Sequence, residues 1–110
     1  MTIFQKIIDR EIPAEIVYED DNSLAFKDIN PQAPTHILVI PKKPLASISE
    51  MGEGDQAMIG SLMHAATKVA KQLNIEDYRL VINNGAGAGQ TVFHLHVHIL
   101  AGRGLGWPPG

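Results

Sequence analysis

The chain has 110 residues, of which 45% are hydrophobic and 19% charged, and its formal net charge is −3. This length suits one domain with its own core, so we expect a single domain over residues 1–110. The absence of cysteine excludes disulfides, thiolate metal sites and a cysteine nucleophile. The slightly acidic balance argues against a nucleic-acid partner, and no apolar run is long enough for a membrane span or a signal peptide. We therefore expect a cytoplasmic protein.

The first part of the chain predicts a short helix and a hairpin. Thr2 suits the N-cap of a short helix that would have its apolar residues Ile3, Phe4, Ile7 and Ile8 on one side and would be ended by Pro13. Two short strands, Ile16–Glu19 and Leu24–Asp28, flank a polar turn and read as a hairpin.

A third strand and a long helix are predicted next. His36–Ile40 is rich in aliphatic residues. From Met58 to Leu73, apolar residues recur at intervals of three and four, and Asp55 near the start of this helix suits its dipole. Two further strands, Arg79–Asn83 and Val92–Leu100, complete an α+β fold with a largely antiparallel sheet.

The last predicted strand carries three histidines and follows the glycine-rich loop GAGAG. Because side chains alternate between the two faces of a strand, His94, His96 and His98 would share one face, about 6.7 Å apart. The opposite face is apolar and suits packing against the long helix; it consists of Phe93, Leu95, Val97 and Ile99. Three histidines in strict alternation beside such a loop indicate a functional site.

A row of histidines can serve a metal or an anion. Imidazoles at positions i and i+2 can converge on zinc. The loop instead favours phosphate, because its backbone N–H groups can be approached closely, Thr91 adds a hydroxyl, and no carboxylate follows Tyr78. A histidine beside phosphate acts as a general acid–base or as a nucleophile, and the central His96 is best placed to attack. We expect no metal and no cofactor.

The segment His94-Leu95-His96-Val97-His98-Ile99-Leu100 resembles the His-x-His-x-His-x-x signature of the histidine-triad (HIT) superfamily. T-I-F-Q-K-I-I, E-I-P-A, F-K-D-I-N-P-Q-A-P-T-H, V-I-P-K-K and W-P-P-G resemble its Hint branch, the histidine-triad nucleotide-binding proteins, from Thr2 to Gly110. The resemblance implies a five-stranded, mainly antiparallel sheet with one long and one short helix. It also implies a homodimer with joined sheets, whose tail (residues 102–110) reaches the partner. The implied activity is hydrolysis of purine nucleoside phosphoramidates, such as adenosine 5′-monophosphoramidate and lysyl-AMP, to a nucleoside monophosphate and an amine.

The resemblance also implies a catalytic set made of His36, Asn83, Thr91, His94, His96 and His98. In this set His96 would be the nucleophile that becomes nucleotidylated, and His94, supported by His36, would orient it. His98, the threonine and the backbone N–H groups around Gly89 would hold the α-phosphate. Asn83 would lie beside the phosphate and the leaving group.

The nucleoside half of the implied site lies toward the N-terminus. Asp28 would accept hydrogen bonds from the ribose hydroxyls, and Ile29 would line the same wall. The purine slot would consist of Ile3, Phe4, Ile7, Phe26 and Leu38. Thr91 and Phe93 depart from the family, which often has Ser and Tyr at these positions. Two alternatives stay open: a nucleotide-binding regulatory protein with vestigial catalysis, and a zinc protein built on the three histidines.

Overall fold

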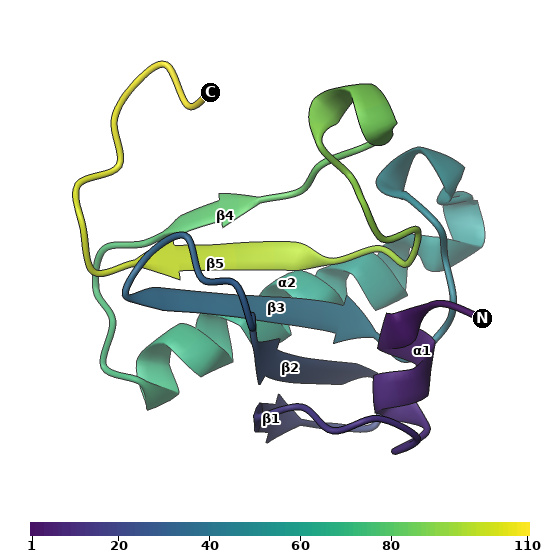
Figure 1. Ribbon diagram of the computed structural model, residues 1–110. Coiled ribbons are helices and arrows are strands. Elements are labelled where there is room, and N and C mark those ends of the chain that lie inside the picture. Colours follow the sequence, from purple (N-terminus) through teal and green to yellow (C-terminus); the bar gives the residue numbers. More distant parts are fainter.

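The computed structural model describes residues 1–110 and opens with a short helix, α1 (Ile3–Ile8) (Figure 1). Thr2 caps it as predicted, because its hydroxyl oxygen accepts a hydrogen bond from an amide of the first turn at 3.2 Å. The helix ends well before Pro13, so the predicted stop is wrong. Arg10 adopts the left-handed conformation (φ 62°), and the amide of Glu11 then donates back into the last turn at 2.8 Å, which closes the helix end.

Five strands form one antiparallel sheet in the order β1-β2-β3-β5-β4. The strands are β1 (Ile16–Glu19), β2 (Ser23–Lys27), β3 (Thr35–Pro41), β4 (Arg79–Val81) and β5 (Val97–Ala101). Short 3-10 turns, η1 (Ile48–Glu50), η2 (Glu53–Asp55) and η3 (Ala86–Ala88), lie in the connections. The predicted α+β class, with its five-stranded sheet and two helices of unequal length, is confirmed.

The last strand is shorter than predicted. β5 begins at Val97, so residues 92–96 lie outside the sheet, and β4 ends at Val81. The reason is a competing partner: the amide of Leu95 donates at 2.7 Å to the carbonyl of Leu45, in the segment that follows β3. The chain before β5 is therefore held by that segment rather than by β4, and His94 and His96 reach their positions from irregular backbone.

The long helix α2 (Gln56–Gln72) covers one face of the sheet (Figure 1). Its predicted inner positions Leu62, Ala65, Ala66 and Val69 are buried against Ala25, Ile37, Val39, Leu95, Val97 and Ile99. One detail differs from the prediction: Leu73 lies beyond the helix end and is 38% exposed. Asp55 stands at the N-cap position of α2, as its predicted place near the helix start requires. Its carboxylate accepts from the amide of Gly52 and pairs with Lys43.

The opposite face of the sheet packs against α1. Phe4 and Ile7 of this helix bury Leu24, Phe26, Leu38 and Ile40. The period of two along β3 divides the core: Ile37 and Val39 point toward α2, whereas Leu38 and Ile40 point toward α1. His36 shares the parity of the α1 side, so this face receives the histidines. None of the helices has the length and apolar character needed to cross a membrane.

Candidate active site

A cavity of about 260 Å³ opens between α1, the sheet and the segment before β5. Its walls include all five residues predicted for the purine slot, Ile3, Phe4, Ile7, Phe26 and Leu38, together with Asp28, Ile29, Thr91, His96 and His98. Phe4 meets the Phe26 ring edge-on, with ring centroids 5.4 Å apart, and the His96 ring edge-on at 5.1 Å. The cavity thus combines aromatic and aliphatic side chains with imidazole rings.

The other predicted site residues lie around this cavity rather than on its wall. His36 lies behind His98, on the neighbouring strand β3. His94 borders a separate, open depression that also contacts Phe93. Asn83 lies next to Gly89, where a Cβ added to the glycine would come within 3.7 Å of the asparagine Nδ2.

A chain of hydrogen bonds fixes the tautomer of His98. The backbone amide of Gln32 can only donate, and it does so at 3.0 Å to Nδ1 of His36. Neutral His36 therefore carries its proton on Nε2, which lies 2.9 Å from Nδ1 of His98 and 3.5 Å from Oδ2 of Asp28. Nδ1 of His98 accepts, so its proton is on Nε2. That Nε2 is buried and has no hydrogen-bond partner in the protein, which leaves a preorganised donor on the cavity wall.

The tautomer of His96 follows from the same logic. Carbonyl oxygens can only accept, so Nδ1–H of His96 donates to the carbonyl of His94 at 2.8 Å. The ring of His94 is held by its Nε2–H, which donates to the carbonyl of Pro41 at 2.8 Å. Nε2 of His96 keeps its lone pair on a ring that lines the cavity. A ring nitrogen with a free lone pair and a donor N–H thus stand on adjacent rings, whose centroids are 4.9 Å apart.

All four histidines of the site favour the neutral state. Burial lowers the pKa values of His36, His94 and His96. Burial also lowers the pKa of His98, to about 4, and the neighbouring His96 and His36 add to this shift. Neutral rings are what the hydrogen-bond chains require, so the electrostatics and the tautomers agree.

The glycine loop folds into the turn η3 and presents Thr91 at its exit. Gly85 and Gly89 have φ values of 91° and 96°, a conformation that favours glycine. The amide of Gly89 donates within the loop to Ala86 at 3.0 Å, whereas the amide of Thr91 has no protein acceptor. Thr91 therefore offers the cavity a free N–H beside its hydroxyl, and the phosphate contact at Gly89 stays a prediction.

The predicted alternation holds only in part. Leu95, Val97 and Ile99 pack on the α2 side, whereas His94 and His96 contact Phe4 of α1 on the other. Phe93 was expected on the apolar face, but it is 48% exposed and borders the open depression. This prediction is wrong because residues 92–96 do not follow strand geometry. The histidine face is not open to solvent either, since His94 is 2% exposed and His96 is 6% exposed.

The groups closest to a metal-binding arrangement are not the three alternating histidines. Asp28, His36 and His98 each offer one ligand atom, and these atoms lie within 4.8 Å of one another. His94 and His96 each use one ring nitrogen on a carbonyl and do not join this group. The zinc alternative that the sequence left open, on His94, His96 and His98, is therefore not supported by the positions of these three rings.

Sequence reasoning missed several residues around the cavity. Ile12, Pro13 and Ala14 add to its apolar wall, and Gln32 fixes the first tautomer through its backbone. A backbone contact leaves no signal in the residue type. Gln90 is 2% exposed, and the only signal of its role in the sequence is its place directly after the glycine loop.

Known proteins resemble this chain over most of its length. The family model described as the HIT domain matches residues 9–105. An uncharacterised HIT-like protein of Synechocystis sp. is 64% identical over 110 residues, covering 99% of this chain and 96% of the relative. A maize protein named 14 kDa zinc-binding protein is 54% identical over 112 residues, with 99% and 88% covered.

Solved structures of the same family also resemble this chain. A HIT family hydrolase from Legionella pneumophila superposes with a TM-score of 0.96 at 46% identity, and 100% of each chain is covered. The histidine triad nucleotide-binding protein from Candida albicans has a TM-score of 0.83 at 32% identity, covering 98% of this chain and 83% of the other. These neighbours share the fold over nearly the whole chain.

Proposed function

The chain belongs to the HIT domain family, and from this premise we propose that it hydrolyses purine nucleoside phosphoramidates to a nucleoside monophosphate and an amine. One observation carries the proposal: a histidine nitrogen with a free lone pair and a histidine N–H donor without a partner stand side by side on one cavity wall. A nucleophile beside a preorganised donor is the arrangement that phosphoryl transfer requires.

The reaction has two steps. Nε2 of His96 attacks phosphorus, the P–N bond breaks, and the amine leaves with the bonding electron pair and takes up a proton. Water then attacks the phosphorus of the nucleotidyl-histidine, gives up a proton, and the monophosphate leaves as His96 is regenerated. Nε2–H of His98 and the amide and hydroxyl of Thr91 stabilise the charge on the phosphoryl oxygens in both steps.

The rest of the cavity suits a nucleoside. Phe4 and Phe26 provide apolar and aromatic surface for a purine, and the Asp28 carboxylate lies on the same cavity with an oxygen within 4.8 Å of a ring nitrogen of His98. Oδ1 of Asp28 accepts from the amide of Asn30 at 2.8 Å, which holds the carboxylate in place to receive the two ribose hydroxyls. Surface for a base, an acceptor for ribose hydroxyls and donors for a phosphate thus belong to one cavity, which supports the proposal.

The test is turnover of adenosine 5′-monophosphoramidate together with intact-mass detection of a nucleotidyl adduct. We expect wild-type protein to hydrolyse this substrate in EDTA and to carry the adduct transiently, and we expect His96→Ala to lose both. His64→Ala is the matched control, because His64 is an exposed histidine of α2 outside the cavity. A wild-type protein that binds AMP but never turns over would favour the regulatory alternative.

A second candidate function, zinc binding, rests on the Asp28–His36–His98 group and on the name of the maize relative. The Gln32 contact argues against it, since a metal on Nε2 of His36 would require the proton to move to Nδ1, where the amide already donates. Two results would establish this alternative over the hydrolase. The purified protein would contain stoichiometric zinc and lose it in the Asp28→Asn variant, and its activity would be sensitive to a chelator.

We also propose a homodimer. β4 is a sheet edge of three residues, and Trp107 in the tail is 84% exposed. An unpaired edge and an exposed tryptophan are typical of surfaces that a second copy covers. Sedimentation at micromolar concentration should give the mass of two chains, and a single 12.0 kDa species would contradict the proposal.

A further inference from the structure

The side chain of Gln90 is a buried hydrogen-bond centre next to the site. It is 2% exposed although it lies in a loop, and every polar atom of its amide has a partner. Oε1 accepts from the amide of Gly85 at 2.9 Å, and Nε2 donates to the carbonyls of Ala46 at 2.7 Å and Val92 at 3.1 Å. No other loop residue of the chain makes three such bonds to three separate segments.

These bonds join three segments of the chain, and the third of them carries Thr91 and Val92 on the cavity wall. Gly85 begins the glycine loop, Ala46 lies in the segment after β3, and Val92 lies on the way into β5 (Figure 1). The bond from Nε2 to the carbonyl of Val92 also bridges across Thr91. Because glycine-rich backbone has little conformational preference of its own, the position of Thr91 depends on these side-chain bonds.

We propose that Gln90 is the positioning residue for phosphate binding, acting through Thr91. The inference rests on the proposed function, since it assumes that the free amide and hydroxyl of Thr91 receive the nucleotide phosphate. Gln90 itself does not line the cavity. It therefore controls the phosphate contacts of a nucleotide and leaves unchanged the base and ribose contacts, which come from α1, β2, β3 and the residues directly after β2.

Two substitutions of Gln90 remove different subsets of its three hydrogen bonds. Gln90→Met keeps the length of the side chain and removes all three hydrogen bonds. Gln90→Glu keeps the acceptor for Gly85 but places a carboxylate oxygen against the carbonyls of Ala46 and Val92. Both release Thr91, and the glutamate variant provides the result if the methionine variant fails to fold.

The experiment compares the binding of AMP and adenosine by calorimetry, since the two ligands differ only in the phosphate. In wild-type protein AMP should bind more tightly than adenosine. In the Gln90 variants we expect AMP affinity to fall about tenfold or more, the effect of losing one hydrogen bond to a charged group, and adenosine affinity to change less than about twofold. The turnover rate of the phosphoramidate should fall about 100-fold, because a small displacement of a stabilising group is costly.

Gln72→Ala is the matched control. Nε2 of Gln72 also donates to a backbone carbonyl, that of Val17 at 2.9 Å, but this bond is exposed and remote from the cavity. The control should leave the affinity ratio of AMP to adenosine unchanged. Equal losses for the two ligands, or an unchanged ratio in both Gln90 variants, would show that Gln90 has only a structural role. A wild-type protein that does not prefer AMP would instead contradict the proposed function.

Discussion

The two faces of the sheet are made by the same strands, yet they differ in what they bury. Toward α2, β3 presents Ile37 and Val39, which are 1% and 0% exposed and belong to the apolar cluster under the helix. Toward α1, the same strand presents His36 and Leu38, next to a cavity and a chain of imidazoles. Because its side chains alternate, β3 contributes to the hydrophobic core on one face of the sheet and to the candidate site on the other.

The difference comes from the size of the covering helix. α2 has 17 residues and closes its face with a continuous aliphatic layer. α1 has six residues and covers only part of the opposite face, so a cavity remains beside it. In that cavity the histidines are desolvated enough to stay neutral but accessible enough to meet a ligand. The cavity therefore exists because α1 covers this face of the sheet only in part.

The largest effect should come from the α2 face. Leu62 is fully buried between α2 and the sheet, so Leu62→Ala should reduce the free energy of unfolding by about 3–5 kcal/mol. Because the α2 side does not contact the cavity, the turnover number of the fraction that stays folded should match wild type. Urea denaturation and active-site-titrated kinetics measure the two quantities. A changed turnover number would show that the faces are coupled.

His98→Ala should have the opposite effect, with a large loss of turnover and a small loss of stability. Loss of one preorganised donor should lower the turnover number about 100- to 1,000-fold. The stability loss should be smaller than that of Leu62→Ala, because the imidazole removed was itself buried with one nitrogen unpartnered. Kinetics with the phosphoramidate measure the turnover number, and thermal unfolding measures the stability. A turnover number near that of wild type would show that His98 takes no part in the reaction.

The apolar face was more predictable from sequence than the histidine face. Leu62 and Val69 follow the helical period and Val97 and Ile99 follow the strand period, so local pattern alone sorts them to the core. Residues 92–96 follow the strand period in sequence but not in backbone structure, since the bond from Leu95 to Leu45 joins positions far apart in sequence. A strand was therefore predicted where tertiary contacts hold irregular backbone, and Phe93 was assigned to the wrong environment.

For the site, the sequence indicated residue types better than their contacts. The spacing of His94, His96 and His98 pointed to a site, and the family resemblance supplied the apolar residues that the fold brings together on one cavity. The tautomers depend on the carbonyls of Pro41 and His94 and on the amide of Gln32. These are backbone groups that every residue carries, so no sequence pattern marks them.

The neutral histidines should also make stability pH-dependent. In the unfolded chain His98 has an ordinary pKa of 6.5, whereas in the folded protein its pKa is about 4, so between these values the unfolded chain binds a proton that the folded chain does not. The free energy of unfolding should therefore decrease as the pH falls through this window, by up to about 1.4 kcal/mol per pH unit for this histidine. The decrease is complete only below pH 4.

Urea denaturation at several pH values measures this slope, and His98→Gln sharpens the comparison because it removes the titrating ring. The variant should show a shallower slope between pH 6.5 and pH 4, with a residual slope from His36, His94 and His96, whose pKa values are also lowered by burial. An identical slope in wild type and variant would mean that His98 is not held neutral by the fold.

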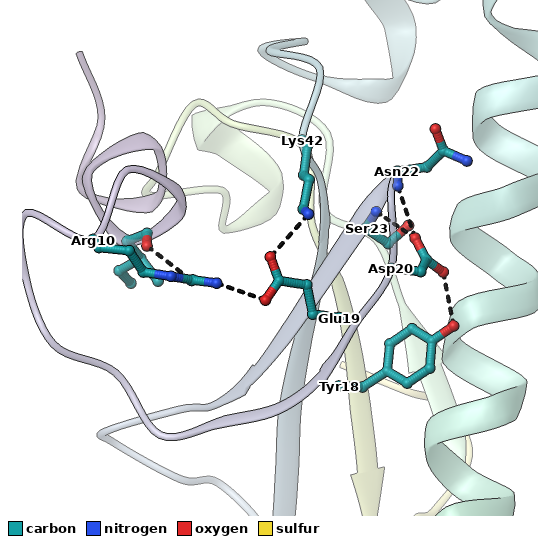
Figure 2. Close-up of polar contacts among 8 residues, drawn as sticks. Arg10, Tyr18, Glu19, Asp20, Asn22, Ser23 and Lys42 are labelled. Carbon is teal, nitrogen blue, oxygen red and sulfur yellow. Dashed lines mark hydrogen bonds and ion pairs between the residues drawn. The ribbon is translucent and has the colours of Figure 1, made fainter.

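The smallest effect should come from the rim where α1 meets the hairpin. Figure 2 shows Glu19 at the end of β1 between two cations: its Oε1 lies 2.6 Å from Arg10, which follows α1, and its Oε2 lies 2.8 Å from Lys42, which follows β3. The neighbouring cations hold the pKa of Glu19 below its ordinary value. The group is open to solvent, so the pairs should add little stability although they tie α1 to the sheet.

Glu19→Gln should therefore lower the melting temperature by only a few degrees. The difference from wild type should disappear in about 1 M salt, where the Debye length is near 3 Å. If the loss persists at high salt, Glu19 contributes through packing or hydrogen bonding rather than through charge. If turnover of the phosphoramidate also falls more than about twofold, the position of α1 over the cavity depends on this pair, and the short helix needs a support that its own packing through Phe4 and Ile7 does not supply.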